Sequence, residues 1–214
     1  KGKKLLDVSC KEGDILESVK SKGFICRGTN FEPNFRHRQD TAVDYDVDLR
    51  NGLPYEDESF DIVLLVEVLE HISCHDDIIK ELSRILKPGG RLILTTPNVM
   101  RLNSRVHFLL TGYHKTKRRF IPFETQLAEA HKYHNFPIDF PVLYYFAKQN
   151  GLNLEALGHS KVKAYSRFLL ALLWLPVSIY SWYTLYVREH SGAQTKENLK
   201  LLRWLCHPRI LTED

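Results

Sequence analysis

Two acidic residues, Asp48 and Glu67, occupy positions where ligand chemistry is expected. Asp48 lies near the end of a predicted strand at 43–49. Glu67 directly follows 60–66, a nearly unbroken apolar run that is typical of a strand covered on both faces. Parallel sheets bind ligands beyond the carboxyl ends of their strands. We therefore expect both carboxylates to lie at one ligand-binding edge.

A metal site is the alternative chemistry that the spacing suggests. His71 lies four residues after Glu67 and four before His75, so the three would share one helical face. No further ligand follows at useful spacing, although Asp76 and Asp77 are close. Helix capping and solvation explain these side chains better, so we expect no metal. Serine-type catalysis is set aside because the chain has no nucleophile-elbow motif.

The elements that must position these residues alternate between strands and helices. Strands are predicted at 5–8, 24–28, 43–49, 60–66, 91–96 and 152–157, and helices at 14–22, 75–86, 100–111 and 140–150. The Arg- and His-rich segment 34–40 is either helix or loop. Short connections between alternating elements predict an α/β fold, a Rossmann-like doubly wound, mostly parallel sheet with helices on both faces.

The stretch 46–72, DVDLRNGLPYEDESFDIVLLVEVLEHI, resembles the class I S-adenosylmethionine-dependent methyltransferases. The match is to the pattern D-L-x-x-G-L-P-F-x-D-x-S-F-D-x-V-x-x-x-E-V-L-E-H-I of their small-molecule branch, which includes quinone and glycan methyltransferases. Tyr55 stands where Phe is usual, and LKPGGRLILTTPN at 86–98 adds a second match. The resemblance implies methyl transfer and S-adenosylmethionine as cofactor.

The cofactor loop departs from the family pattern. The family's first strand ends in D-x-G-x-G-x-G, whereas this chain reads DVSCKEG from Asp7 to Gly13, with Ser9 and Lys11 replacing two glycines. Glycines there let the backbone approach the cofactor closely. The resemblance nevertheless implies that Asp7, Ser9 and Gly13 contact the cofactor.

The other implied cofactor contacts come from the next strands. Asn30 occupies the place of the acidic residue that binds both ribose hydroxyls, and an amide lacks the charge and the bidentate acceptance of a carboxylate. Asp48 and the Leu49 backbone would lie beside the adenine, and Glu67 near the methionine portion.

Two histidines are candidate catalytic bases. An oxygen acceptor needs a group that takes its proton, and imidazole titrates near neutral pH. His71 matches the family histidine that faces the pocket, and His134, within HNFP at 134–137, would reach it from a loop above. A structural role for either histidine remains an open alternative.

Composition favours a reduced, cytoplasmic protein with a basic second half. The four cysteines have no C-x-x-C spacing and 1–4 (KGKK) leads directly into a strand, so no disulfide framework, zinc site or signal peptide is expected. Residues 1–100 carry 14 Lys and Arg against 18 Asp and Glu, and residues 101–214 carry 16 against 8. A basic half suits lipid headgroups or a phosphorylated substrate. Nucleic acid is not expected, because the chain shows no nucleic-acid-binding motif.

The tract 168–187 has 20 residues without a charge, the length of a bilayer-spanning helix. Pro176 splits it, so a helical cap packed on protein, an interfacial membrane contact and a spanning helix all remain open. We expect a methyltransferase domain at 1–160, with a substrate-loop insertion at about 101–140. An apolar and basic helical appendage at 161–214 would follow, with the family's final strand missing.

Two functions follow from these observations. The first is methyl transfer to a small or lipid-linked acceptor, such as a glycan or a quinone-like molecule. The second is a catalytically inactive binding or scaffold module near a membrane, which the substitutions Ser9, Lys11 and Asn30 suggest. The sequence predicts no oligomeric state.

Overall fold

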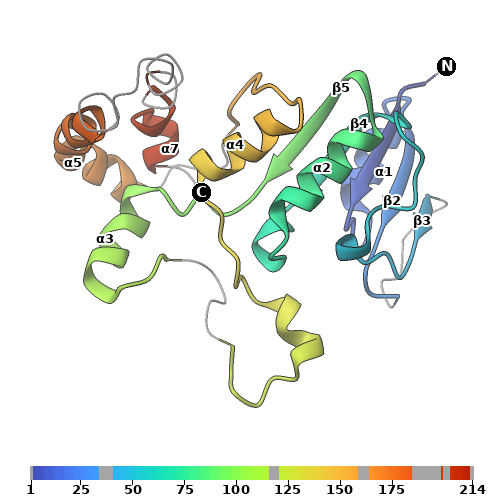
Figure 1. Cartoon of the computed structure of the whole chain (residues 1–214), viewed down its shortest axis with the longest axis horizontal. Helices are drawn as coiled ribbons and strands as arrows, with labels where there is room; N and C mark the ends of the chain where they lie inside the picture. Colours follow the sequence, from blue (N-terminus) through green and yellow to red (C-terminus); the bar gives the residue numbers. More distant parts are fainter. Residues whose placement is uncertain are drawn as a thin grey trace.

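A parallel sheet with strand order β3-β2-β1-β4-β5 organises the molecule (Figure 1). The computed structural model describes residues 2–33, 41–115, 121–158, 164–184, 199 and 203–212. Its strands are β1 (Lys4–Val8), β2 (Ile25–Thr29), β3 (Ala42–Asp44), β4 (Phe60–Val66) and β5 (Leu86–Thr95). Each neighbouring pair is parallel, which confirms the predicted sheet.

Helices cover both faces of this sheet. The α-helices are α1 (Asp14–Lys20), α2 (His75–Ile85), α3 (Leu102–Thr111), α4 (Phe140–Gln149), α5 (Ala164–Trp182) and α7 (Pro208–Thr212). Short 3₁₀ helices are η1 (Leu49–Asn51), η2 (Leu69–His71) and η3 (Leu127–Lys132). Successive strand residues point to opposite faces. Thus Leu5 packs with Leu16 of α1, whereas Leu6 joins Leu82 of α2 in the larger cluster on the other face.

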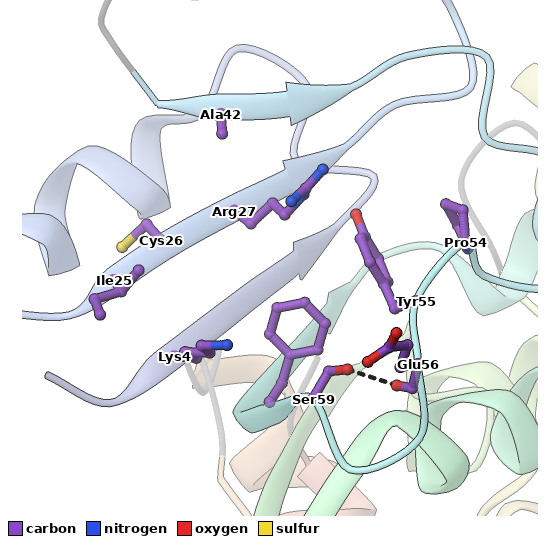
Figure 2. A pocket seen from close by; sticks show the side chains of 10 residues that line it. Lys4, Ile25, Cys26, Arg27, Ala42, Pro54, Tyr55, Glu56 and Ser59 are labelled. Carbon is purple, nitrogen blue, oxygen red and sulfur yellow. Dashed lines mark hydrogen bonds between the residues drawn. The ribbon is translucent and has the colours of Figure 1, made fainter. Parts of the chain in front are cut away.

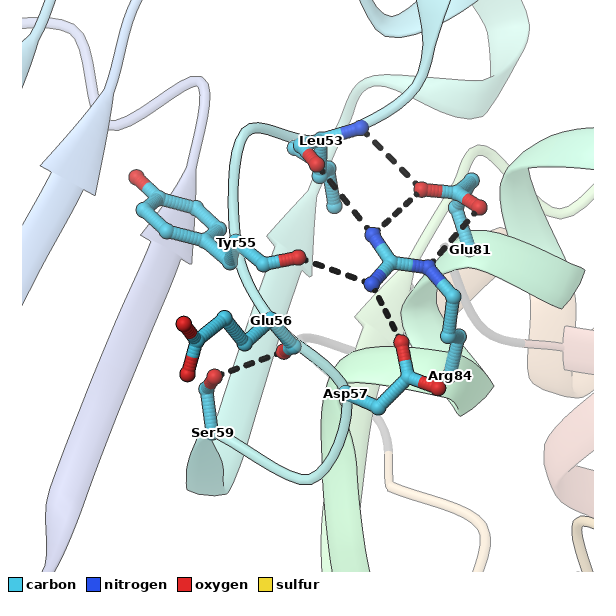
Figure 3. A network of polar contacts seen from close by, with 7 residues as sticks. All are labelled: Leu53, Tyr55, Glu56, Asp57, Ser59, Glu81 and Arg84. Atoms are coloured by element: carbon cyan, nitrogen blue, oxygen red, sulfur yellow. Dashed lines mark hydrogen bonds and ion pairs between the residues drawn. The ribbon is translucent and has the colours of Figure 1, made fainter.

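The acidic loop before β4 is fixed by Arg84 of α2 (Figure 3). The guanidinium donates to the carbonyl oxygens of Tyr55 (2.7 Å) and Leu53 (3.2 Å) and pairs with Asp57 (2.7 Å) and Glu81 (2.8 Å). Glu81 also accepts from the Leu53 amide at 3.1 Å. The loop therefore has a structural partner on α2, although the side chains of Glu56, Asp57 and Glu58 are exposed.

The third strand is shorter than predicted. It ends at Asp44 instead of continuing to residue 49, and Asp46 has a φ of 56°. That left-handed conformation cannot continue an extended strand. Asp48 consequently caps η1, where its side chain accepts from the Arg50 amide.

The predicted sixth strand at 152–157 is wrong, because these described residues form no strand. The Leu152 amide instead donates back to the carbonyl of Ala147 at the end of α4, after Gly151 with a φ of 77°. An exposed ion pair, Arg91–Glu155 at 3.2 Å, links this segment to β5. The fifth strand begins earlier than predicted, at Leu86, with an irregular register opposite Phe60 and Ile62.

A third apolar cluster joins helices from distant parts of the chain. Leu102 of α3, Leu169 of α5 and Leu211 of α7 are all buried together. The helix α5 passes through Pro176 without ending. Of the apolar tract at 168–187, residues 168–184 belong to the described part of the chain and residues 185–187 lie outside it. Within the described ranges, no helix combines the length and the apolar character that crossing a bilayer requires. The predicted segment 34–40 also lies outside the described residues.

Candidate active site at the carboxyl ends of the strands

The predicted site residues follow neighbouring strand ends. Because β1, β2 and β4 are parallel, Ser9, Asn30 and Glu67 all come from the same edge of the sheet. The chain runs outward from β1 through β2 to β3 and returns on the other side of β1 as β4. Such a reversal of strand order is where open α/β sheets bind ligands.

The loop after β1 keeps a left-handed conformation at alternate residues. The φ angles are 63° at Ser9, 52° at Lys11 and 82° at Gly13. These are the positions where the family pattern has glycine. The loop is anchored to β2, because the amides of Ser9 and Cys10 donate to the hydroxyl and the carbonyl of Thr29 at 3.1 and 2.9 Å. The loop thus has the backbone conformation of a glycine-rich loop, although Ser9 and Lys11 carry side chains at two of its three left-handed positions.

Asn30 is buried and holds this loop. Its Oδ1 accepts from the Lys11 amide at 2.8 Å, and its Nδ2 donates to the Lys11 carbonyl at 2.9 Å. Both ends of the amide are therefore engaged by the protein. A ribose contact from Asn30, as the sequence predicts, requires sharing or releasing these bonds.

Asp7 is also buried, 3% exposed, at the base of the same loop. Desolvation raises the pKa of its carboxyl to about 7. A carboxyl held close to its protonated form gains from a cationic or hydrogen-bonding ligand. Asp7 is therefore positioned to respond to the charge of whatever occupies the loop.

The predicted adenine contacts lie at η1. Asp48 accepts from the backbone amide of Arg50 at 3.0 Å and pairs with its guanidinium at 2.7 Å. The hydrogen bonds from Arg50 lower the pKa of Asp48, so this carboxylate is charged. Leu49 packs partly buried against the core, which leaves its backbone as the group available for the predicted role.

Glu67 directly follows β4 and has a φ of 54°. Its amide donates to the Thr95 carbonyl at 3.0 Å, and its carboxylate accepts from the Thr95 hydroxyl at 3.0 Å. The side chain is exposed at the edge of the sheet. Glu67 is thereby held between the ends of β4 and β5.

The structure brings His71 and His134 together, with the carboxylate of Glu70 beside both rings. The two rings meet edge to face with centroids 4.7 Å apart. Glu70 Oε1 lies 4.0 Å from His71 Nε2 and 3.9 Å from His134 Nε2. Sequence reasoning did not select Glu70; the signal available in the sequence was an acidic residue between an apolar residue and His71.

Backbone contacts orient the cluster. His71 Nδ1 donates to the carbonyl oxygen of Tyr133 at 3.1 Å, and the backbone of His131 gives a further contact. In the neutral ring, the lone pair is therefore on Nε2. Burial lowers the pKa of His71. The Phe136 amide donates to the Glu70 carbonyl at 3.0 Å and docks the histidine loop onto η2.

A hollow of about 390 Å³ lies elsewhere (Figure 2). Its lining includes the first residues of β1, β2, β3 and β4, which are Lys4, Ile25, Ala42 and Phe60. It therefore belongs to the amino-terminal edge, opposite the predicted cofactor residues. We assign it no part in the candidate site.

The chain belongs to the methyltransferase-domain family, whose model matches residues 1–140. It is 30% identical over 105 residues to the ubiquinone biosynthesis O-methyltransferase of Coxiella burnetii, covering 46% of this chain and 45% of that protein. It is 36% identical over 103 residues to the demethylmenaquinone methyltransferase of Staphylococcus epidermidis, covering 44% and 42%. The chain thus spans less than half the length of these curated relatives.

Solved structures share the fold. An S-adenosylmethionine-dependent methyltransferase from Archaeoglobus fulgidus aligns with a TM-score of 0.52 at 15% identity, covering 99% of this chain and 82% of that one. A phosphoethanolamine N-methyltransferase from Haemonchus contortus, solved with S-adenosylhomocysteine, aligns with a TM-score of 0.52 at 16% identity, covering 95% and 44%. These similarities confirm the Rossmann-like methyltransferase fold.

Proposed function

We propose that this chain transfers a methyl group from S-adenosylmethionine to a small-molecule acceptor. The observation that carries the proposal is the left-handed backbone at Ser9, Lys11 and Gly13, at the carboxyl end of β1. Such a loop suits the cofactor because its turn keeps the backbone path of a glycine loop at the strand reversal, where a ligand can approach the chain closely. Quinone-directed relatives support a small aromatic acceptor.

The residues that would hold the cofactor come from three strand ends. Asp7, Ser9 and Gly13 lie around the first loop, Asp48 and Leu49 lie at η1, and Glu67 follows β4. Asn30 would act through the loop that it holds. Bound S-adenosylmethionine supplies an activated methyl group on a sulfonium. The protein's contribution to the transfer is alignment of donor and acceptor.

His71 is the base that the geometry favours. Its Nδ1 proton is committed to Tyr133, and its lowered pKa keeps Nε2 unprotonated at neutral pH. Nε2 can therefore accept a proton from an acceptor hydroxyl. His134, whose Nε2 faces the same carboxylate of Glu70, is the second candidate for this role.

Calorimetry with S-adenosylmethionine and S-adenosylhomocysteine tests the proposal. We expect saturable binding of both, and radiolabelled methyl transfer to acceptors of quinone biosynthesis that falls at least tenfold in His71→Gln. Glu155→Gln, an exposed residue far along the chain, is the matched control and keeps full activity. Absent binding at millimolar cofactor would favour the inactive scaffold, which the engaged amide of Asn30 supports.

A lipid-linked acceptor is supported by exposed apolar side chains on α3 and α5. Leu109 and Leu110 are 82% and 77% exposed, and Phe168, Leu172 and Tyr180 of α5 are each more than half exposed. Exposed apolar patches mark surfaces that bind a membrane or another protein, and an apolar helix face can lie in a membrane interface. Co-sedimentation with anionic vesicles should fall at least fivefold in the double variant Leu109→Ser/Leu110→Ser. The control Phe123→Ser removes an exposed aromatic side chain elsewhere, and equal loss in both would contradict a specific contact.

A further inference from the structure

The cluster of Glu70, His71 and His134 has the composition of a metal site. One ligand atom from each residue can be chosen so that all three lie within 4.8 Å of one another. The residues come from two segments, η2 after β4 and the loop before α4, so helical spacing along the sequence cannot reveal the set. Helical spacing pointed instead to Glu67, His71 and His75.

Glu70 supplies a buried and unsatisfied acceptor. The side chain is 1% exposed, and among the described residues no donor reaches Oε1. The other oxygen, Oε2, accepts from the Thr96 hydroxyl at 3.3 Å. An unsatisfied carboxylate oxygen is costly to bury, and a cation beside it offsets that cost.

The two imidazoles direct their Nε2 atoms at that oxygen. The Nδ1–H group of His71 donates a hydrogen bond to the Tyr133 carbonyl oxygen. The Nε2 atom of the neutral ring therefore presents its lone pair to Glu70. Two acceptors that face each other repel unless a proton or a metal ion lies between them. The separations of 4.0 and 3.9 Å exceed a hydrogen bond.

Those separations suit an ion better than a proton. Ligand bonds of about 2.0–2.2 Å around tetrahedral zinc put ligand atoms about 3.3–3.6 Å apart. Each histidine need approach Glu70 by only about 0.3–0.7 Å, and the two histidine ligand atoms already lie within 4.8 Å of each other, so small shifts make a three-ligand set. The hydrogen bond from His71 Nδ1 to a carbonyl and the one from Thr96 to Glu70 are the outer contacts that orient metal ligands.

We propose that Glu70, His71 and His134 bind one divalent transition-metal ion. Two imidazoles and one carboxylate favour Zn²⁺, Co²⁺ or Fe²⁺ over Mg²⁺ and Ca²⁺, which prefer oxygen ligands. His71 and His134 retain partial exposure, 24% and 12%, so the site keeps a side open for a further ligand. This binding does not rest on methyl transfer. A bound ion and a base at His71 Nε2 would be alternative states of one site.

Equilibrium dialysis of the tag-free chain against Zn²⁺ tests the proposal, with metal content measured by mass spectrometry. We expect one Zn²⁺ per chain, unaffected by millimolar Mg²⁺. Affinity should fall at least tenfold in Glu70→Gln and in His134→Gln. His75→Gln is the matched control, because its Nε2 bonds the Leu69 carbonyl, and its affinity should stay within about threefold of the parent.

Co²⁺ provides a readout that does not depend on the variants. Substitution of the parent protein should give the visible absorption bands of a low-symmetry site, and Zn²⁺ should remove them. Fewer than about 0.2 Zn²⁺ ions bound per parent chain would overturn the proposal. Unchanged Zn²⁺ affinity in folded Glu70→Gln and His134→Gln would overturn it as well. Cofactor calorimetry is a separate measurement, so failure of either proposal is distinguishable from failure of the other.

Discussion

The side-chain amide of Asn30 closes on the backbone of Lys11 from both ends, accepting from its amide and donating to its carbonyl at 2.8 and 2.9 Å. The two residues are 19 positions apart and belong to the loops after β2 and β1. An amide can make this reciprocal pair because it carries one acceptor and one donor group. A carboxylate cannot.

Asn30→Asp is therefore expected to destabilise the protein. The new oxygen would face the Lys11 carbonyl inside the protein, at a site that is 1% exposed. We expect a loss of about 2 kcal/mol at pH 7 in urea unfolding, with partial recovery at pH 4 as the carboxyl protonates. The exposed Asn153→Asp, where the amide oxygen accepts from Lys148, should change stability little. Equal effects of the two variants would contradict the closed pair.

Ser9→Gly and Lys11→Gly are expected to stabilise the chain. Both residues hold a positive φ, which costs a residue with a side chain about 1 kcal/mol. Glycine removes that cost but adds about 0.4–1 kcal/mol through unfolded-state entropy, so we expect a net gain of up to about 0.6 kcal/mol for each variant.

The control for this effect is Ser21→Gly. Ser21 has an ordinary φ of −61° at the end of α1, so the same substitution should be neutral or destabilising. Thermal unfolding of the three variants measures the contrast. Destabilisation by Ser9→Gly would show that its side chain, and not the backbone, determines the loop.

Asp7 should make stability depend on pH. Its folded pKa of about 7 lies above the unfolded value of about 3.9. The folded chain therefore holds the proton more tightly, and the contribution of Asp7 is present below about pH 4 and lost as pH rises to about 7.

Asp7→Asn should remove this dependence of the free energy of unfolding on pH. At pH 8 we expect the variant to be more stable than the parent by about 2–4 kcal/mol, and at pH 4 to match it. Urea unfolding across pH 4–8 measures the difference. Asp14→Asn, at the exposed start of α1, is the control and should retain the parent slope. A parallel shift of the Asp7→Asn curve would refute the assignment.

Arg84 should contribute more to the free energy of unfolding than Arg50 does. Arg84→Gln removes donors to two carbonyl oxygens and two carboxylates that hold the loop before β4, and we expect a loss of about 2–3 kcal/mol. Arg50→Gln removes an exposed pair with Asp48, for which we expect about 0.5 kcal/mol. Proteolysis within 53–59 should accelerate in Arg84→Gln only, and intact protease resistance would argue against the clamp.

Sequence reasoning predicted what depends on local patterns. The apolar run at 60–66 forms β4, and the spacing of apolar residues at 75–86 forms α2. It failed at 152–157, because alternation alone cannot show whether a partner strand is available. It also missed the end of β3, since no residue type announces the left-handed φ of Asp46.

The site residues also fall into those that the sequence pattern predicts and those that depend on contacts between distant segments. Residues near strand ends, such as Asp7 and Glu67, follow from position in the pattern. The engagement of Asn30 by Lys11 could not be predicted, because it depends on how two loops meet. The approach of His134 to the pocket of His71, 63 positions away, was expected from the HNFP segment, but the contacts that bring the rings together were not: the Phe136 amide docks onto Glu70, and His71 bonds the Tyr133 carbonyl.

The order of the sheet has a consequence for handling the protein. In the part of the chain that the structure describes, β5 is an outermost strand of ten residues. Long edge strands template the addition of strands from other molecules, and natural proteins limit this with charges and proline. Pro88 and Arg91 serve that purpose at the start of β5, whereas Ile93 farther along is half exposed. Self-association at high concentration should therefore begin at Ile93, and a lysine there would act as a gatekeeper.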